Sequence, residues 1–311
     1  MTSCDPLTGE LLAAGPYRRE PAPWGLLQVD GRDATDFLQR LCTQDVAAQA
    51  LDQLRPAAFL DGRGKLQVTC WVARTGEALW LEAQAHQIDR LLTLLDRYHF
   101  SEQVQFRATP EWSCVEWLAA ALPNGMAAGS ARVLAGGGLV VAAQRRGVAM
   151  VRAHGPAAAL AGDAALATLA GKPLSGEVAE CLRMGAGLVK VGVDTEPGTL
   201  ALEADLDDHC SKTKGCYTGQ EIVARISTYG HVNRRLCLLH LQGEGAIDSP
   251  QPLVEPEDGV AVGRVMHAVQ APGRKVRVGL GYLPQDFWAI GSKLQLGQPG
   301  GHAVEVVGFG S

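Results

Sequence analysis

The chain has 311 residues, of which 47% are hydrophobic and 20% charged, and its formal net charge is −5. This length can bury a sizeable core in two or three domains, and the composition is that of a folded globular protein rather than a disordered one. The acidic balance argues against a non-specific nucleic-acid-binding protein, which normally carries an excess of basic residues, so direct nucleic-acid binding is not expected.

Residues 22–108 are predicted to form an N-terminal α+β subdomain. Apolar residues at helical spacing indicate helices over 33–42 and 86–98. Strands are expected at 57–60, 66–73, 78–83 and 102–108, each bounded by turn residues. This order of helices and hairpins is typical of an α+β layer rather than of a parallel βαβ array.

Residues 109–230 are predicted to form a second α+β subdomain. Its expected strands cover 112–119, 131–134, 139–143 and 147–152, and its expected helices cover 156–170, 177–184 and 218–228. The recurrence of strands followed by a helix suggests two related halves, which could interleave.

Residues 231–311 show a different pattern. Short strands are expected at 236–241, 259–267, 275–283, 292–296 and 302–307, separated by Gly and Pro, and no helix is expected between them. This regular spacing predicts a small C-terminal β-barrel.

Two features bear on the compartment. The first 24 residues lack the basic stretch and apolar run of a secretory signal, and the uncharged stretches are too short to cross a membrane. We therefore expect a cytoplasmic protein without a membrane partner. The eight cysteines form no C-x-x-C pair, so we expect free thiols and no bound metal.

The segment 214–221, which reads KGCYTGQE, is the most informative part of the chain. Thr218 followed by Glu221 matches a capping box and predicts that a helix begins at Thr218. Cys216 would then lie at the helix N-terminus, where the macrodipole and the nearby charge of Lys214 favour a thiolate. Most cytosolic cysteines are small buried hydrophobic residues, but the flanking glycines indicate a turn and favour a functional thiol.

This segment resembles the KGCYxGQE signature of the YgfZ family, folate-binding proteins related to the glycine-cleavage T-protein and linked to iron–sulfur cluster maintenance. Further similarity lies at 29–39, 59–65, 182–187 and 202–206, so the resemblance covers most of residues 24–236. It implies an α+β, T-protein-like fold in which two α+β subdomains surround a central funnel for tetrahydrofolate and a C-terminal β-barrel follows.

The resemblance also implies which residues act. We expect the chemistry at Cys216 and Lys214, and tetrahydrofolate binding at Arg183, Glu203, Tyr217, Gln220 and Arg225. A carboxylate such as Glu203 can accept two N–H bonds from the edge of a pterin, and Gln220 offers both a donor and an acceptor. An arginine can pair with the glutamate tail, although Arg225 could equally pair with Glu221 one turn earlier on its helix.

One difference separates the chain from aminomethyltransferases, which carry acidic residues just after the glycines of the first hairpin. The corresponding stretch here, 64–69, reads GKLQVT and contains no Asp or Glu, and Gly185 stands where those enzymes usually have Glu. Since a carboxylate orients the substrate amine in aminomethyl transfer, ordinary T-protein chemistry is not expected, and whether the chain is an enzyme stays open.

Three functions therefore compete. The leading hypothesis is a tetrahydrofolate-binding accessory factor that assembles or repairs iron–sulfur clusters, acts through Cys216, contacts client or assembly proteins transiently and supports tRNA modification indirectly. The alternative is a folate-dependent one-carbon (aminomethyl or methyl) transferase, which would need a replacement acid or base such as Glu203, Asp207 or His209. The third is a binding module that folate only stabilises.

Overall fold

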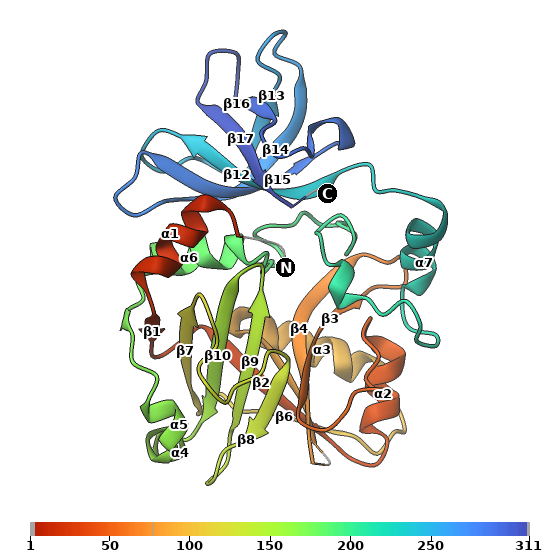
Figure 1. Cartoon of the computed structure of the whole chain (residues 1–311). Coiled ribbons are helices and arrows are strands. Elements are labelled where there is room, and N and C mark those ends of the chain that lie inside the picture. Colours follow the sequence, from red (N-terminus) through yellow and green to blue (C-terminus); the bar gives the residue numbers. More distant parts are fainter. Residues whose placement is uncertain (1–3, 77, 310–311) are drawn as a thin grey trace.

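The computed structural model describes residues 4–76 and 78–309, in which a large curved sheet forms the body and a closed barrel sits at one end of it (Figure 1). Helices α1 (Pro6–Ala14) and α6 (Gly176–Gly185) lie between the body and the barrel. The predicted α+β fold with a C-terminal barrel is confirmed.

The body is one sheet of eleven strands in the order β11-β1-β7-β10-β9-β8-β3-β4-β5-β2-β6. One half contains β2 (Trp24–Asp30), β3 (Gln53–Leu60), β4 (Leu66–Thr75), β5 (Ala78–Gln84) and β6 (Gln105–Ala108). The other half contains β1 (Tyr17–Arg19), β7 (Ser113–Ala119), β8 (Ser130–Val133), β9 (Leu139–Arg145), β10 (Val148–Gly155) and β11 (Lys172–Pro173). The halves join where β3 pairs with β8, and β1, which the sequence did not indicate, belongs to the half built mainly from later residues.

Helices cover the outside of the sheet. The amphipathic helices α2 (Ala34–Leu41) and α3 (Ile88–Tyr98), the latter preceded by the 3-10 turn η1 (Ala85–Gln87), bury their apolar faces against the first half. The single helix expected over 156–170 is instead two short helices, α4 (Ala157–Gly162) and α5 (Ala164–Ala167). The break falls at Asp163, because its carboxylate accepts the N–H of Leu166 and pairs with Arg132.

A buried ion pair holds the two halves face to face. Arg152 on β10 donates two hydrogen bonds to Glu82 on β5, at 2.9 and 2.6 Å, and both side chains are fully buried. These strands are not neighbours in the sheet, so the contact requires the sheet to curve back on itself. Burial would raise the pKa of Glu82, but Arg152 and His154 outweigh it and hold the pKa at about 2.

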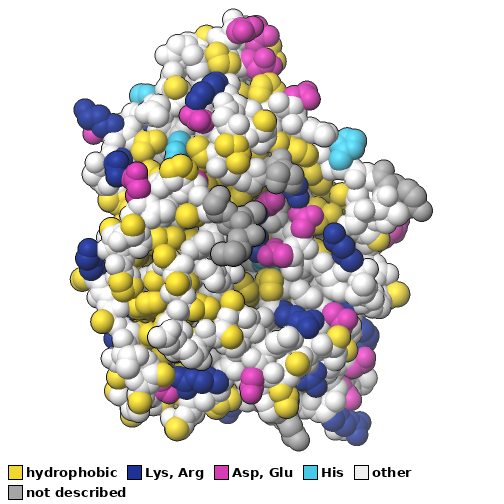
Figure 2. Space-filling model, viewed as in Figure 1, with side chains coloured by type: hydrophobic (Ala, Val, Ile, Leu, Met, Phe, Trp, Pro, Cys, Tyr) yellow, Lys and Arg dark blue, Asp and Glu magenta, His cyan; other side chains and the backbone are white. Residues whose placement is uncertain are grey.

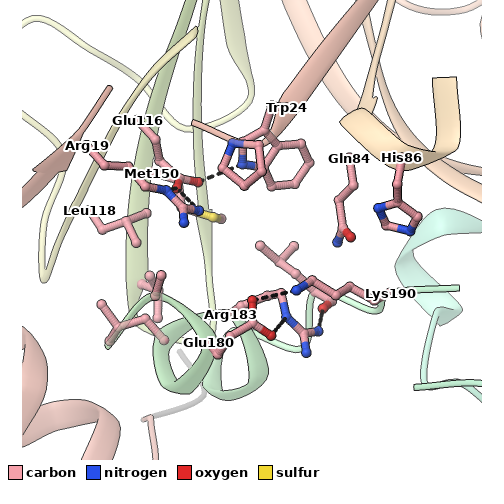
Figure 3. A pocket seen from close by; sticks show the side chains of 15 residues that line it. Arg19, Trp24, Gln84, His86, Glu116, Leu118, Met150, Glu180, Arg183 and Lys190 are labelled. Atoms are coloured by element: carbon pink, nitrogen blue, oxygen red, sulfur yellow. Dashed lines mark hydrogen bonds and ion pairs between the residues drawn. The ribbon is translucent and has the colours of Figure 1, made fainter. Parts of the chain in front are cut away.

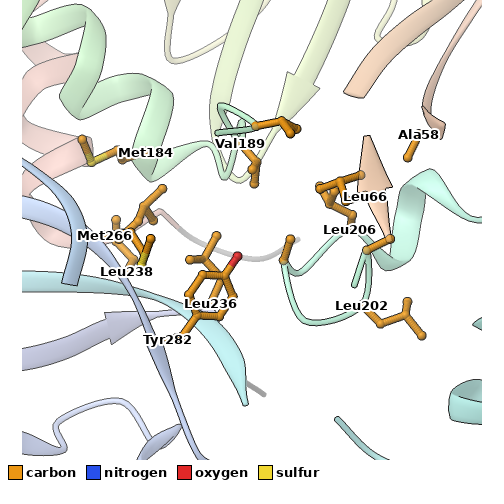
Figure 4. Packing of buried hydrophobic residues seen from close by; sticks show 14 of the residues in the cluster. Ala58, Leu66, Met184, Val189, Leu202, Leu206, Leu236, Leu238, Met266 and Tyr282 are labelled. Carbon is orange, nitrogen blue, oxygen red and sulfur yellow. The ribbon is translucent and has the colours of Figure 1, made fainter. Parts of the chain in front are cut away.

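The barrel closes in the order β12-β15-β14-β13-β16-β17. Its strands are β12 (Arg235–Gln242), β13 (Gln251–Val254), β14 (Ala261–Gln270), β15 (Val276–Leu283), β16 (Lys293–Leu296) and β17 (Ala303–Gly308), with the 3-10 turn η3 (Gln285–Phe287) after β15. Side chains alternate along β12. Cys237 and Leu239 fill the barrel, whereas Leu236 and Leu238 belong to the core cluster between the barrel and the body, which also contains Met184 of α6 (Figure 4).

The last helix, α7 (Gln220–Tyr229), lies at the side of the body (Figure 1). Its Ile222 packs against Gly64 in the first hairpin, where an added Cβ would come within 2.7 Å of the isoleucine side chain. Within residues 4–76 and 78–309, we find no helix that combines the length and the apolar character needed to cross a membrane. On the face shown in Figure 2, Lys and Arg side chains are interspersed with Asp and Glu.

Candidate functional site

A cavity of about 110 Å³ lies where the facing halves of the sheet meet α6 (Figure 3); we call it the central cavity. Its apolar wall contains Trp24, Leu118, Val148, Met150 and Leu182. Its polar wall contains Arg19, Gln84, His86, Glu116, Glu180, Arg183 and Lys190. An apolar cavity with a few converging polar groups is the usual form of a small-molecule site.

A smaller pocket of about 20 Å³, the inner pouch, adjoins the central cavity and shares Trp24, Gln84 and Leu188 with it. Its other lining residues are Thr69, Cys70, Trp71, Val189 and His209. This volume accommodates about one water-sized group. The two pockets therefore lie on shared side chains, and two tryptophans and several polar side chains line the inner pouch.

Arg183, predicted to bind folate, lies in the wall of the central cavity. Its Nε donates to Glu180 at 2.9 Å, its Nη1 donates to Asp194 at 2.6 Å, and Lys190 binds the same Glu180 at 2.6 Å. Burial would lower the pKa of Arg183, but Asp194 and Glu180 outweigh it and raise the pKa. The guanidinium is thus a fixed positive charge whose donors are largely used within the protein.

The KGCYTGQE segment borders a different depression, the outer groove, with a volume of about 260 Å³. Lys214, Tyr217 and Gln220 line it, together with Asp207, Cys210 and Val223. Cys216 is exposed, unlike the other cysteines, of which Cys4 is half-buried and the rest are buried. The accessible position expected for the Cys216 thiol is therefore present.

Lys214 has a structural contact that the sequence did not indicate. Its ammonium donates to the backbone carbonyls of Gln39, Cys42 and Gln44 at 2.7, 2.7 and 2.8 Å. The three bonds use all three ammonium donors, so none is left for a thiolate at Cys216. Burial lowers the pKa of Lys214. The predicted role of Lys214 as a tuning group for the thiol is not supported by this geometry, in which it anchors the segment to the end of α2.

The predicted capping box at Thr218 is wrong. Helix α7 has Gly219 as its N-cap, in the left-handed region with φ 80°, and the first turn has no side-chain cap. A Cβ on Gly219 would lie 2.6 Å from the carbonyl oxygen of Asp61, so contact with the hairpin turn sets this conformation. Gln220 instead reaches back, and its Oε1 accepts the N–H of Tyr217 at 3.1 Å.

The remaining predicted folate ligands lie elsewhere. Glu203 accepts the N–H of Leu200 at 3.0 Å with one oxygen, and its other oxygen lies 3.5 Å from Nε of Arg234. The side chain of Arg225 is exposed on α7 and makes no hydrogen bond or ion pair with the described part of the chain, so the alternative pairing with Glu221 is not seen. Neither Glu203 nor Arg225 lines the central cavity, the inner pouch or the outer groove.

The predicted residues thus divide between two places. Arg183 lies at the central cavity, whereas Lys214, Tyr217 and Gln220 lie at the outer groove. The chain around η2 (Asp207–His209) forms a common wall, since His209 lines the inner pouch and Asp207 lines the outer groove. Sequence reasoning missed Trp24, Gln84, Glu180 and Lys190 as cavity residues. They come from separate elements and form no local motif.

Comparisons with known proteins agree with this architecture. No protein-family model matches the chain. The crystal structure of glycine cleavage system aminomethyltransferase T from Bartonella henselae superposes with a TM-score of 0.80 at 21% identity, and the match covers 98% of this chain and 89% of that one. A curated protein of Arabidopsis thaliana, "Putative transferase At1g60990, chloroplastic", is 34% identical over 97 residues, which are 31% of this chain and only 22% of that protein. The chain therefore has the fold of the glycine cleavage aminomethyltransferase T.

Proposed function

We propose that this chain binds tetrahydrofolate in the central cavity and serves as an accessory factor for the assembly or repair of iron–sulfur clusters in client enzymes. The observation that carries the proposal is the exposed thiol of Cys216, held in an anchored KGCYTGQE segment on a T-protein fold. The resemblance of that segment to the YgfZ signature supplies the cluster-related role. Transient contact with clients would then occur at the outer groove.

The residues of the central cavity fit the ring end of a folate. A pterin is flat and presents donors and acceptors along its edge, and the cavity offers an indole face at Trp24 together with the amide of Gln84. Gln84 is 7% exposed, and neither atom of its amide is bonded within the described residues. Because a buried amide without a partner is costly, a ligand that bonds to it is favoured. Lys190, which pairs with Glu180, lines the same cavity.

Thermal unfolding with increasing tetrahydrofolate, kept reduced under anaerobic conditions, tests the binding step. The unfolding temperature should rise with ligand concentration, because a ligand that binds only the folded state stabilises it. Ala179→Leu, which adds bulk to the cavity wall on α6, should weaken this rise. Ala165→Leu, the same change at an exposed helical position, should not. An unfolding temperature that is independent of tetrahydrofolate would refute folate binding.

Cys216→Ser tests the cluster-related step. The variant should fold and bind folate normally, yet fail to restore the activity of iron–sulfur enzymes in cells that lack the wild-type chain. Cys4→Ser, at the half-buried cysteine, is the matched control and should restore that activity. Full rescue by Cys216→Ser would end the proposed role of this thiol and favour a binding module that folate only stabilises.

The second candidate function is a folate-dependent one-carbon transferase, and the shared fold with aminomethyltransferase T favours it. Against it stands the first hairpin, whose residues 64–69 bring Thr69 rather than a carboxylate to the inner pouch. Production of methylene-tetrahydrofolate from a methylated amine by the purified protein would establish this function. Folate binding without any such turnover would exclude it for the amines tested.

A further inference from the structure

The sequence left Glu203, Asp207 and His209 as possible acid–base groups, and their positions separate them. The carboxylate of Glu203 accepts the N–H of Leu200 and pairs with Arg234. Asp207 is exposed, pairs with Arg235 at 2.5 Å and faces the outer groove. His209 is 4% exposed and lines the inner pouch. Of the three, it is the one that lines the pouch adjoining the central cavity.

The 3-10 turn η2 holds His209 in this position. The carbonyl oxygen of His209 accepts the hydroxyl of Thr43 at 2.6 Å, and its N–H donates to the carbonyl of Leu206. Its ring centroid lies 6.4 Å from that of Trp71, which follows Thr69 on β4. The imidazole therefore lies beside the strand where the first hairpin contributes no carboxylate.

A neighbouring carboxylate fixes the tautomer of His209. Nδ1 lies 2.8 Å from Oδ1 of Asp208, and the other oxygen of Asp208 binds Arg145. Burial lowers the pKa of His209 well below its usual range, and Arg145 adds to this effect. A neutral imidazole whose Nδ1–H donates to Asp208 leaves the lone pair of Nε2 as an acceptor. Nε2 has no hydrogen-bond partner within the described residues.

Gln84 supplies a second unsatisfied group at the same pouch. It lines both the inner pouch and the central cavity, and Figure 3 shows its amide projecting towards the side of the cavity formed by Arg183 and Lys190. Its buried Oε1 has no partner among residues 4–76 and 78–309. Trp24 and Trp71 add flat apolar surfaces. A water-sized pouch with two neutral acceptors between aromatic rings suits an amino or ring N–H group of a planar heterocycle.

We propose that His209 accepts a hydrogen bond from an N–H group of the ligand inside the inner pouch, with Gln84 as the second contact and Asp208 as a positioning residue that sets the tautomer. The proposal rests on folate binding in the central cavity. It identifies the inner pouch as the place where the protein forms hydrogen bonds with the edge of the heterocycle. The interaction is a hydrogen bond, and no atom is transferred.

The test follows the histidine nitrogens of the full-length protein, labelled with ¹⁵N, by NMR. His209 should show a protonated Nδ1 and an unprotonated Nε2, and the Nε2 signal should shift as tetrahydrofolate saturates the protein. His209→Leu, which has no acceptor atom, should weaken tetrahydrofolate binding by about tenfold in calorimetric titration, the loss expected for one such hydrogen bond. Asp208→Asn should change the tautomer and weaken binding less. His231→Leu, the same change at an exposed histidine, should leave the affinity unchanged.

The outcomes separate this inference from the proposed function. If the wild-type protein does not bind tetrahydrofolate, both fail. If it binds, but the Nε2 signal stays in place and His209→Leu binds equally well, only the role of His209 is refuted. Should His209→Leu unfold, the NMR titration of the wild-type protein alone decides, because it needs no substitution.

Discussion

The central cavity with its adjoining inner pouch and the outer groove lie on either side of the chain around η2, yet they are built differently. The cavity collects side chains from strands of both sheet halves and from α6, and buried ion pairs hold its frame. The groove is formed largely by one contiguous stretch and leaves Cys216 exposed. A preformed, enclosed site suits a small ligand, whereas an exposed thiol on an anchored segment suits a macromolecular client. Changes in one region should therefore leave the other intact.

The largest effect is expected at the frame of the central cavity. Glu82→Gln removes the carboxylate that pairs with Arg152 and leaves a buried guanidinium without a counterion, which costs about 3–5 kcal/mol of unfolding free energy. Denaturant titration measures this loss. Glu305→Gln breaks the exposed pair with Lys293 and should cost at most about 1 kcal/mol. Equal effects of the two substitutions would show that the buried pair does not hold the halves together.

Low pH should weaken the same ion pair between Glu82 and Arg152. The pKa of Glu82 is about 2 in the folded chain, below its ordinary value of 4.5, so the ionised form stabilises the fold. This contribution is complete above about pH 4.5 and is lost as the pH falls towards 2. Near-ultraviolet circular dichroism should report the change, because Trp24 lies 4.1 Å from the guanidinium of Arg152. Glu82→Gln should lack this part of the acid dependence; an unchanged acid transition would contradict the assignment.

A smaller effect, confined to the outer groove, is expected at Lys214. Lys214→Met removes three charge-assisted hydrogen bonds and should cost about 2 kcal/mol. It should also change the rate at which iodoacetamide alkylates Cys216, since the segment is no longer fixed to α2, while folate affinity stays the same. Lys212→Met, at an exposed position, is the control and should alter neither rate nor stability. Loss of folate binding in Lys214→Met would mean that the two regions are coupled.

The contrast also explains what the sequence could reveal. Helices α2 and α3 and the barrel follow from local periodicity, and the KGCYTGQE segment stands out because its residues are contiguous. The helix start at Thr218 failed because a tertiary contact between Gly219 and the turn at Asp61 overrides the capping pattern. The contact of Glu203 with the backbone N–H of Leu200, three residues earlier, depends on the local chain path and was not indicated by the sequence. The residues that line the central cavity could not be predicted from the sequence, because they are far apart along the chain and only the curvature of the sheet brings them together.

The smallest effect is expected at Arg225, and it separates the sequence-based site from the one that the geometry supports. The side chain is exposed on α7 and unbonded within the described residues, so Arg225→Ala should change unfolding free energy by no more than about 0.5 kcal/mol. Folate affinity, measured by calorimetric titration, should stay at the wild-type value, because Arg225 does not line the central cavity or the inner pouch. A clear loss of folate affinity with normal stability would indicate that folate binds beside α7 rather than in the central cavity. The thiol of Cys216 and the folate would then share one site, and the division between an enclosed ligand cavity and an exposed client groove would no longer hold.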